Sequence, residues 1–241
     1  MSSQHQAAFL DEKQKPFRVG SIDSKQPGKD EVLIRNRAIA INPVDWKVQD
    51  SGYFLDSYPA ILGEDLAGEI EAVGEGVTRF KKGDRVLAHS HFLQNKKLEH
   101  ASFQELVAVP ASAVATIPDA MKFEDATVLP LAISTAAAAL YQPTSETCLG
   151  LDLPTASPAK KNKTLLIWGG SSSVGSAGIQ LAVASGYTVV TTCSKKNFDF
   201  VEKLGATPVD YNSPGVVGDL TAELQKGEFV GAYDGKSALT H

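Results

Sequence analysis

The fold is decided by the stretch Thr164-Leu165-Leu166-Ile167-Trp168-Gly169-Gly170-Ser171-Ser172-Ser173-Val174-Gly175. Its apolar start predicts a buried strand over Thr164–Trp168, and the residues after the glycines predict a helix over Val174–Ser185. The glycines in between allow a tight turn and a close approach of the backbone to a pyrophosphate, which binds at the positive end of the helix. The spacing is neither Gly-x-Gly-x-x-Gly nor a Walker loop. The turn nevertheless stands between a strand and a helix, which favours a dinucleotide site over a bare turn.

The residues that follow this turn alternate between strand and helix patterns. We expect strands and helices in the order Thr188–Cys193, Asp199–Leu204, Thr207–Tyr211, Gly218–Gln225 and Phe229–Tyr233. Gly205 stands where a C-cap glycine is preferred. Alternating units of this size predict a doubly wound parallel sheet. The chain completes one three-strand half of such a sheet and starts a fourth strand, so we expect the domain to be incomplete.

The segment after the second strand of this sheet predicts the choice of cofactor. An NAD site carries an acidic residue here that binds the ribose hydroxyls. The sequence instead has Ser194, Lys195, Lys196 and Asn197, whose donor groups suit a 2′-phosphate. We therefore predict NADPH rather than NADH. The alternative is that the two lysines belong to a solvated loop.

The first half of the chain has a different pattern. Short β-branched runs bounded by Gly, Pro or Asp predict strands near Glu31–Asn42, Leu66–Val73, Arg85–Ala88 and Ser102–Val109. They indicate an antiparallel β unit. Phe123–Tyr141 is expected to be helical, with Pro130 starting a new turn or a kink. We expect a β domain over 1–122, a connecting helix and linker over 123–163, and a dinucleotide-binding domain over 164–241.

Composition excludes several classes of protein. The formal net charge is -5 and no long basic run is present, which is unlike a nucleic-acid-binding protein. The N-terminus lacks the features of a signal peptide, and the longest run of small apolar residues, Ala136–Leu140, is too short to cross a membrane. Cys148 and Cys193 cannot form a Cys-x-x-Cys pair. We expect a soluble, cytoplasmic protein that binds neither nucleic acid nor membranes.

Five segments together resemble the medium-chain dehydrogenase/reductase superfamily. They are Asn42–Lys47, Leu62–Glu69, Val73–Val77, Phe80–Val86 and the glycine turn Gly169–Gly175. Within the superfamily the chain is most similar to the zinc-free quinone oxidoreductase and fungal trans-acting enoyl reductase branch. This resemblance implies a GroES-like β domain followed by a Rossmann domain, with substrate and NADPH in the cleft between them.

The resemblance also allows the zinc ligands to be compared position by position. The zinc alcohol dehydrogenases have a cysteine where this chain has Asn42, and Gly-His-Glu where it has Gly63-Glu64-Asp65. The four cysteines of their structural zinc lobe are absent. The remaining metal candidate is His89-Ser90-His91, whose spacing puts both rings on one face of a strand but supplies no third ligand. We therefore expect a metal-free protein, with a zinc alcohol dehydrogenase as a remote alternative.

Without a Lewis acid, the expected reaction is reduction of an activated double bond in an enone or enoyl thioester, or of a quinone. The substrate would be a small molecule, which includes an acyl group bound to a carrier. The resemblance places Val44, Asp45, Trp46 and Lys47 beside the nicotinamide. Lys47 is the candidate proton donor, although it could also be an ordinary surface lysine. Tyr53 is a weaker candidate.

The resemblance also assigns residues elsewhere in the chain. It places Leu129, Pro130, Ile133 and Ser134 against the substrate, Thr135 near the cofactor and Tyr211 by the adenosine. Its relatives continue beyond the position of His241, so we expect a truncated gene model or a splice product. A decayed, non-catalytic dinucleotide-binding protein is the alternative.

Overall fold

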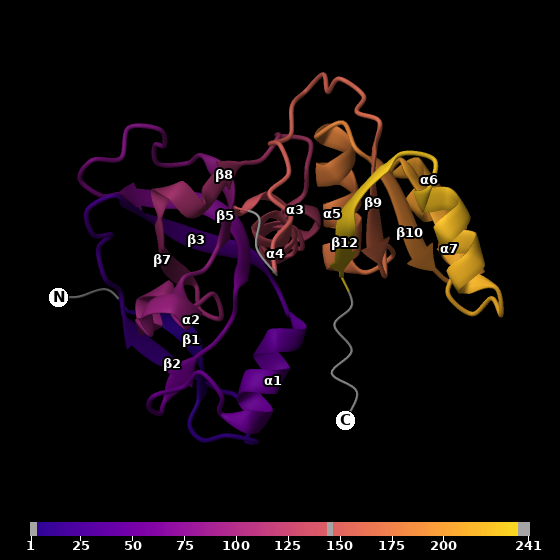
Figure 1. The fold of residues 1–241 in the computed structure, drawn as a ribbon. Helices are drawn as coiled ribbons and strands as arrows, with labels where there is room; N and C mark the ends of the chain where they lie inside the picture. Colours follow the sequence, from indigo (N-terminus) through magenta and orange to yellow (C-terminus); the bar gives the residue numbers. More distant parts are fainter. Residues whose placement is uncertain (1–3, 144–146, 236–241) are drawn as a thin grey trace. The chain divides into compact units, whose positions relative to one another are not determined.

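A computed structural model describes residues 4–143 and 147–235, which form two compact units (Figure 1). The units are Met1–Leu131 and Ala132–His241. The division between them falls inside one helix, α4 (Pro130–Tyr141). The expected linker residues 144–146 lie outside the described part of the chain.

The first unit contains two β-sheets. The larger has the strand order β7 (Leu106–Pro110), β3 (Glu31–Ala40), β5 (Asp65–Val73), β6 (Arg85–His89) and β8 (Val114–Thr116). All its paired strands are antiparallel, which confirms the predicted antiparallel unit. The smaller has the order β2 (Arg18–Asp23), β1 (Gln4–Leu10) and β4 (Ala60–Ile61).

One strand of the larger sheet is shorter than predicted. Strand β7 begins at Leu106 rather than at Ser102. The backbone carbonyls of Ser102 and Gln104 accept hydrogen bonds from the side chain of Asn36, at 2.9 and 2.8 Å. This side chain replaces the strand partner that the ladder would otherwise supply.

The short helices of the first unit follow or precede its strands. They are α1 (Pro43–Ser51), α2 (Phe92–Asn95), α3 (Phe123–Ala126) and the 3₁₀ turns Leu98–His100 and Ala111–Ala113. Helix α1 packs through Val48 into an apolar cluster that includes Leu10, Ile61 and Phe103. A second apolar cluster, which includes Ile34 and Leu66, is formed by buried side chains of the larger sheet.

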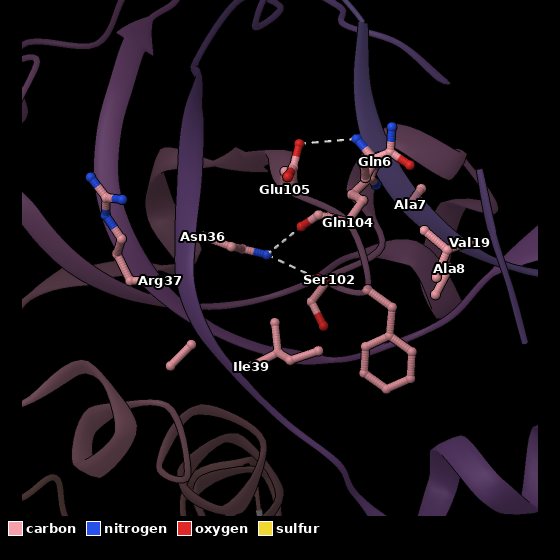
Figure 2. A pocket seen from close by; sticks show the side chains of 12 residues that line it. Gln6, Ala7, Ala8, Val19, Asn36, Arg37, Ile39, Ser102, Gln104 and Glu105 are labelled. Atoms are coloured by element: carbon pink, nitrogen blue, oxygen red, sulfur yellow. Dashed lines mark hydrogen bonds between the residues drawn. The ribbon is translucent and has the colours of Figure 1, made fainter. Parts of the chain in front are cut away.

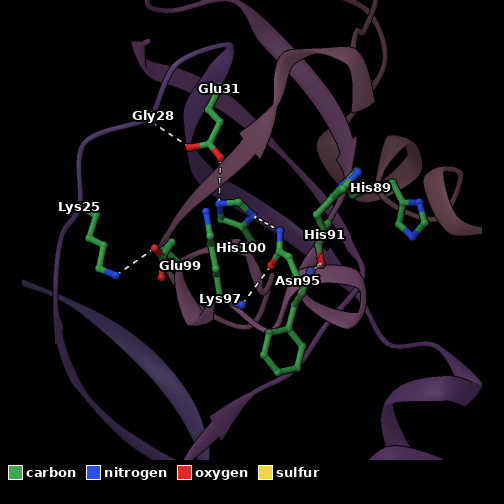
Figure 3. A network of polar contacts seen from close by, with 11 residues as sticks. Lys25, Gly28, Glu31, His89, His91, Asn95, Lys97, Glu99 and His100 are labelled. Atoms are coloured by element: carbon green, nitrogen blue, oxygen red, sulfur yellow. Dashed lines mark hydrogen bonds and ion pairs between the residues drawn. The ribbon is translucent and has the colours of Figure 1, made fainter. Parts of the chain in front are cut away.

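A buried histidine joins several segments of the first unit (Figure 3). His100 is 2% exposed. Its Nε2 lies 3.1 Å from Glu31 Oε1, and its Nδ1 lies 2.8 Å from the side-chain nitrogen of Asn95. Because Asn95 accepts from the backbone N–H of Lys97 through its oxygen, its NH₂ group faces the ring and Nδ1 is the acceptor. Burial lowers the pKa of His100 below its usual range, against the attraction of Glu31 and Glu99.

The second unit holds a four-stranded parallel sheet with the order β11-β10-β9-β12. After α4 its elements are β9 (Lys163–Trp168), α5 (Ser173–Ala184), β10 (Thr188–Cys193), a 3₁₀ turn (Lys195–Asn197), α6 (Phe198–Lys203), β11 (Ala206–Asp210), α7 (Val216–Leu224) and β12 (Glu228–Asp234). Each predicted strand and helix is confirmed within two residues at its ends. The predicted break is confirmed too, since α3 ends at Ala126 and α4 begins at Pro130.

The helices of the second unit cover both faces of its sheet (Figure 1). Ile179 of α5 and Val201 of α6 pack in one cluster with Leu165, Ile167 and Val189. Leu220 of α7 packs with Val190 and Val209 on the opposite face. Alternate strand residues point to opposite faces, which explains this division. The strand order reverses between β9 and β12, and ligands of doubly wound folds bind at the carboxyl ends of the strands at such a point.

One described segment, Phe123–Tyr141, is long and apolar enough to cross a membrane by length and composition alone, with a mean hydropathy of 1.3. The structure divides it into α3 and α4. Ala132, Ala136 and Leu140 on α4 are buried in the clusters of the second unit. A core helix passes the same test of length and composition.

Candidate functional site

The glycine turn is held against the end of strand β10. The backbone N–H of Gly169 donates to Thr192 Oγ1, and that of Gly170 donates to the Thr192 carbonyl, both at 3.0 Å. A Cβ atom at Gly175 would lie 2.3 Å from the Gly169 carbonyl oxygen. Only glycine therefore permits the first turn of α5 to approach the backbone of the glycine turn this closely. Thr192 was not predicted, although a threonine pair at a strand end is a usable signal.

The first turn of α5 has unused backbone donors. Ser172 Oγ accepts from the N–H of Gly175 and donates to the Gly235 carbonyl, both at 2.9 Å, so this hydroxyl is occupied. Among the described residues, the backbone N–H groups of Ser171, Ser173 and Val174 have no hydrogen-bond partner. These donors at the positive end of a 12-residue helix form a site suited to an anion.

A pocket of about 350 Å³ lies at this turn. It is lined by Trp168, Gly169, Ser171, Ser172, Thr192, Cys193, Ser194, Lys196, Asn197 and Tyr211. Seven of these are predicted cofactor residues, so the structure brings together seven of the seventeen residues that were predicted to bind the cofactor. Gly170, Ser173, Val174 and Gly175 belong to the adjoining turn and helix start.

The two lysines after β10 line different hollows. Lys196 lines the pocket at the turn, whereas Lys195 lines a neighbouring hollow with Asp210 and Asp219. Lys195–Asn197 form a 3₁₀ turn, in which successive side chains are rotated by about 120°. The structure thus separates two residues that the sequence grouped together.

Helix α1 carries the residues expected beside the nicotinamide. Trp46 is 55% exposed, and Lys47 is exposed with its Nζ 5.8 Å from the centre of the Trp46 ring. Val44 packs against the apolar cluster, and Asp45 is 4% exposed. Only Trp46 and Lys47 are therefore presented to solvent by this helix segment. Tyr53, the weaker candidate donor, is 68% exposed.

Three carboxyl groups are buried at the start of α1 and at the start of β5. Asp45, Glu64 and Asp65 are each no more than 4% exposed. Asp45 accepts from the backbone N–H of Asn42 at 2.7 Å, which is the reach-back contact of a capping box. Burial, followed by the nearby charges of Glu64 and Asp65, raises the pKa of Asp45 to about 6. Burial also raises the pKa of Asp65.

The histidines of the metal candidate are not arranged as expected. Strand β6 ends at His89, so His91 lies beyond it, and the two ring centres are 6.3 Å apart. His89 Nε2 lies 3.3 Å from Glu64 Oε2 without a geometrically sound hydrogen bond. Within the described ranges, no group of three His, Cys, Asp or Glu residues could hold a metal ion. The amide of Asn42 is bonded to Asp65 Oδ2 at 2.9 Å. The residues present therefore do not fit a zinc site.

The remaining predicted residues lie along the start of α4. Leu129 is half-buried and Pro130 is buried, both in the first unit. Ile133, Ser134 and Thr135 belong to the second unit, where Ile133 and Thr135 are exposed and Ser134 is half-buried. Their roles stay predictions.

A second pocket, of about 310 Å³, lies in the first unit between β1 and β3 (Figure 2). Ala7, Ala38 and Ile39 supply apolar lining, and the Asn36 amide points toward the backbone of Ser102 and Gln104. None of the predicted site residues lines it.

Comparisons with known proteins agree with both halves of this description. Residues 28–119 match the alcohol dehydrogenase GroES-like domain. The chain is 45% identical to trans-enoyl reductase himH of Aspergillus japonicus, covering 89% of this chain and 61% of the relative. It is 38% identical to trans-enoyl reductase tazE of Aspergillus terreus, covering 94% and 75%. Its structure is similar to that of an alcohol dehydrogenase superfamily protein from Novosphingobium aromaticivorans, at 31% identity, a TM-score of 0.77 and coverage of 95% and 65%. The chain spans about three fifths of the length of several curated relatives that it matches.

Proposed function

The chain belongs to the medium-chain dehydrogenase/reductase family, and we propose that its second unit binds NADPH in the pocket at the glycine turn. The observation that carries this proposal is the set of backbone N–H groups of Ser171, Ser173 and Val174, which have no partner in the described part of the chain and lie at the turn whose pocket Lys196 also lines. Oriented donors at a helix N-terminus suit a pyrophosphate, and an ammonium group suits a further phosphate.

Each part of this pocket has a distinct role in the proposal. The backbone at the start of α5 holds the pyrophosphate, and Tyr211 lines the side taken by the adenosine. Ser194, Lys196 and Asn197 hold the 2′-phosphate, with Asn197 Nδ2 3.4 Å from Ser194 Oγ. Lys195 contributes at most long-range attraction, since it lines the other hollow.

We further propose that this protein reduces an enoyl thioester, an enone or a quinone, and that it does so without zinc. When bound, the nicotinamide supplies the hydride for the electron-poor carbon. The exposed ammonium group of Lys47 stabilises the negative charge that develops on the substrate oxygen or supplies its proton. Three of the relatives, himH, tazE and tndF, are named trans-enoyl reductases, which supports an enoyl group as the substrate.

The test is NADPH consumption by the chain with an enone, an enoyl thioester and a quinone, with and without a chelator. The proposal expects turnover that the chelator leaves unchanged. Lys47→Met should lower turnover about 100-fold or more while NADPH affinity is retained, because affinity comes from the pocket at the turn. Tyr53→Phe tests the weaker donor in parallel. NADPH binding without any turnover would instead support the non-catalytic binding protein, and loss of turnover with the chelator would support zinc.

A further inference from the structure

One buried carboxylate joins the beginnings of two helices. Asp65 is the first residue of β5 and is 1% exposed. Its Oδ2 accepts from the side-chain nitrogen of Asn42 at 2.9 Å, and its Oδ1 accepts from the backbone N–H of Leu131 at 2.7 Å. Asn42 is the N-cap of α1, and Leu131 is the second residue of α4. Both oxygens are thus committed, each to a different helix.

The neighbouring polar groups do not form this link. Asp45 reaches back to the N–H of Asn42, within the start of its own helix. Glu64 faces His89 on β6. Among the described residues, Asp65 is therefore the one side chain that bonds to both helix starts.

At these two helix starts lie the candidate catalytic residue of the first unit and two of its candidate substrate contacts. Lys47 lies on α1 five residues after Asn42, and Leu129 and Pro130 directly precede Leu131. Resting on the proposed function, we propose that Asp65 is a positioning residue that sets the placement of Lys47 relative to the Leu129–Pro130 segment. Misplacement by about 1 Å can cost about 100-fold in rate, so a rigid link at this point matters for turnover.

The bonding pattern suggests an exchange of the two side chains as a test. In Asp65→Asn, one acceptor becomes an NH₂ group that faces the NH₂ group of Asn42, or else loses the N–H of Leu131. In Asn42→Asp, two carboxylates meet in a buried space, which is unfavourable. The double variant N42D/D65N restores a donor opposite an acceptor with the same total charge. Aspartate is as good an N-cap as asparagine, so α1 keeps its cap.

The experiment measures amide hydrogen exchange at Leu131 together with kcat and KM in the 241-residue chain. Each single variant should speed exchange at Leu131 about tenfold or more and lower kcat with little change in the KM for NADPH. The double variant should restore slow exchange at Leu131 and the kcat of the unsubstituted chain. Unchanged exchange at Leu131 in Asp65→Asn, or no recovery in the double variant, would overturn the inference.

Failure of the proposed function gives a different result. It would leave the unsubstituted chain without turnover, while the exchange pattern across the three variants would still show whether Asp65 links the helices. If the unsubstituted chain does turn over, the double variant could recover slow exchange at Leu131 without recovering kcat. This result would assign Asp65 a stabilising role only and overturn its positioning role.

Discussion

The glycine turn of the second unit leaves its polar groups open to a ligand, whereas the carboxylate cluster of the first unit uses its polar groups within the protein. At the turn, the groups without a partner among residues 4–143 and 147–235 are backbone N–H donors of neighbouring residues. In the cluster, Asp65 bonds to two segments that are distant in the sequence, Asp45 bonds within the start of its own helix, and both side chains are almost fully buried. The comparison teaches that buried charge in this chain orders the scaffold, and that the capacity to bind an anion lies in exposed backbone.

The strongest effect on NADPH binding is predicted for a substitution at the glycine turn. Gly175→Ala would place a methyl group 2.3 Å from the Gly169 carbonyl oxygen and force this carbonyl and the start of α5 apart. Losing two charge-assisted bonds at about 1.5–3 kcal/mol each predicts NADPH binding at least about 100-fold weaker. A titration with NADPH measures this.

The matched control is Gly218→Ala on α7, where an added methyl group has no atom within 4 Å. It should leave NADPH binding unchanged and stabilise the chain by about 0.5–1 kcal/mol, since alanine is the better helix former. Equal NADPH affinity in both variants would show that the turn is not part of the binding site.

The second prediction concerns the buried carboxyl group of Asp45. The pKa of Asp45 is about 6 in the folded chain and near 3.8 otherwise, so its contribution to stability is present below pH 4 and is lost as the pH rises through 6. The loss amounts to up to about 3 kcal/mol. Asp45→Asn keeps an oxygen for the Asn42 N–H but no charge, so it should be more stable than the unsubstituted chain at pH 8 and similar to it at pH 4.

Urea denaturation across this pH range measures the effect. Asp50→Asn is the control, because Asp50 lies on the same helix but is exposed. If Asp45→Asn is no more stable than the unsubstituted chain at pH 8, the burial argument for this carboxylate is wrong.

The smallest effect concerns the histidine network in Figure 3. Burial lowers the pKa of His100, so the network is complete above pH 6.5 and its stability is lost as the pH falls below that value. Protonation also removes the acceptor for Asn95, at a cost of about 1 kcal/mol. His100→Gln should flatten the acid limb of the stability curve between pH 7 and 5. A limb of unchanged slope would show that His100 does not titrate in this range.

The pocket that we propose for the cofactor could be predicted because its residues are close in sequence. Gly169–Gly175 and Ser194–Asn197 each follow a strand that its apolar residues make easy to recognise. The position of each motif, at the end of a strand, could therefore be predicted together with the motif itself. What the sequence could not show is that a 3₁₀ turn separates Lys195 from Lys196, because that depends on local backbone geometry.

The first unit was harder to predict because its order depends on distant contacts. Asn42 and Leu131 lie 23 and 66 residues from Asp65. Strand β1 was missed because His5 and Ala7 are unusual interior residues for a strand, and His5 is accommodated by bonds to Ser24 and Gln104. Helix α1 was missed because only Asp45 and Val48 on it are buried, which is too few to give a periodic apolar pattern.

The central claim is that the open turn and Lys196 bind NADPH. Its direct test is a titration of the chain with NADPH and NADH, repeated with Lys196→Ala and with Lys195→Ala as the matched control. We predict tighter binding of NADPH than of NADH, at least about tenfold weaker NADPH binding in Lys196→Ala from the loss of a charge-assisted phosphate contact, and little change in Lys195→Ala. Equal affinity for the two cofactors, or equal losses in the two variants, would contradict the assignment.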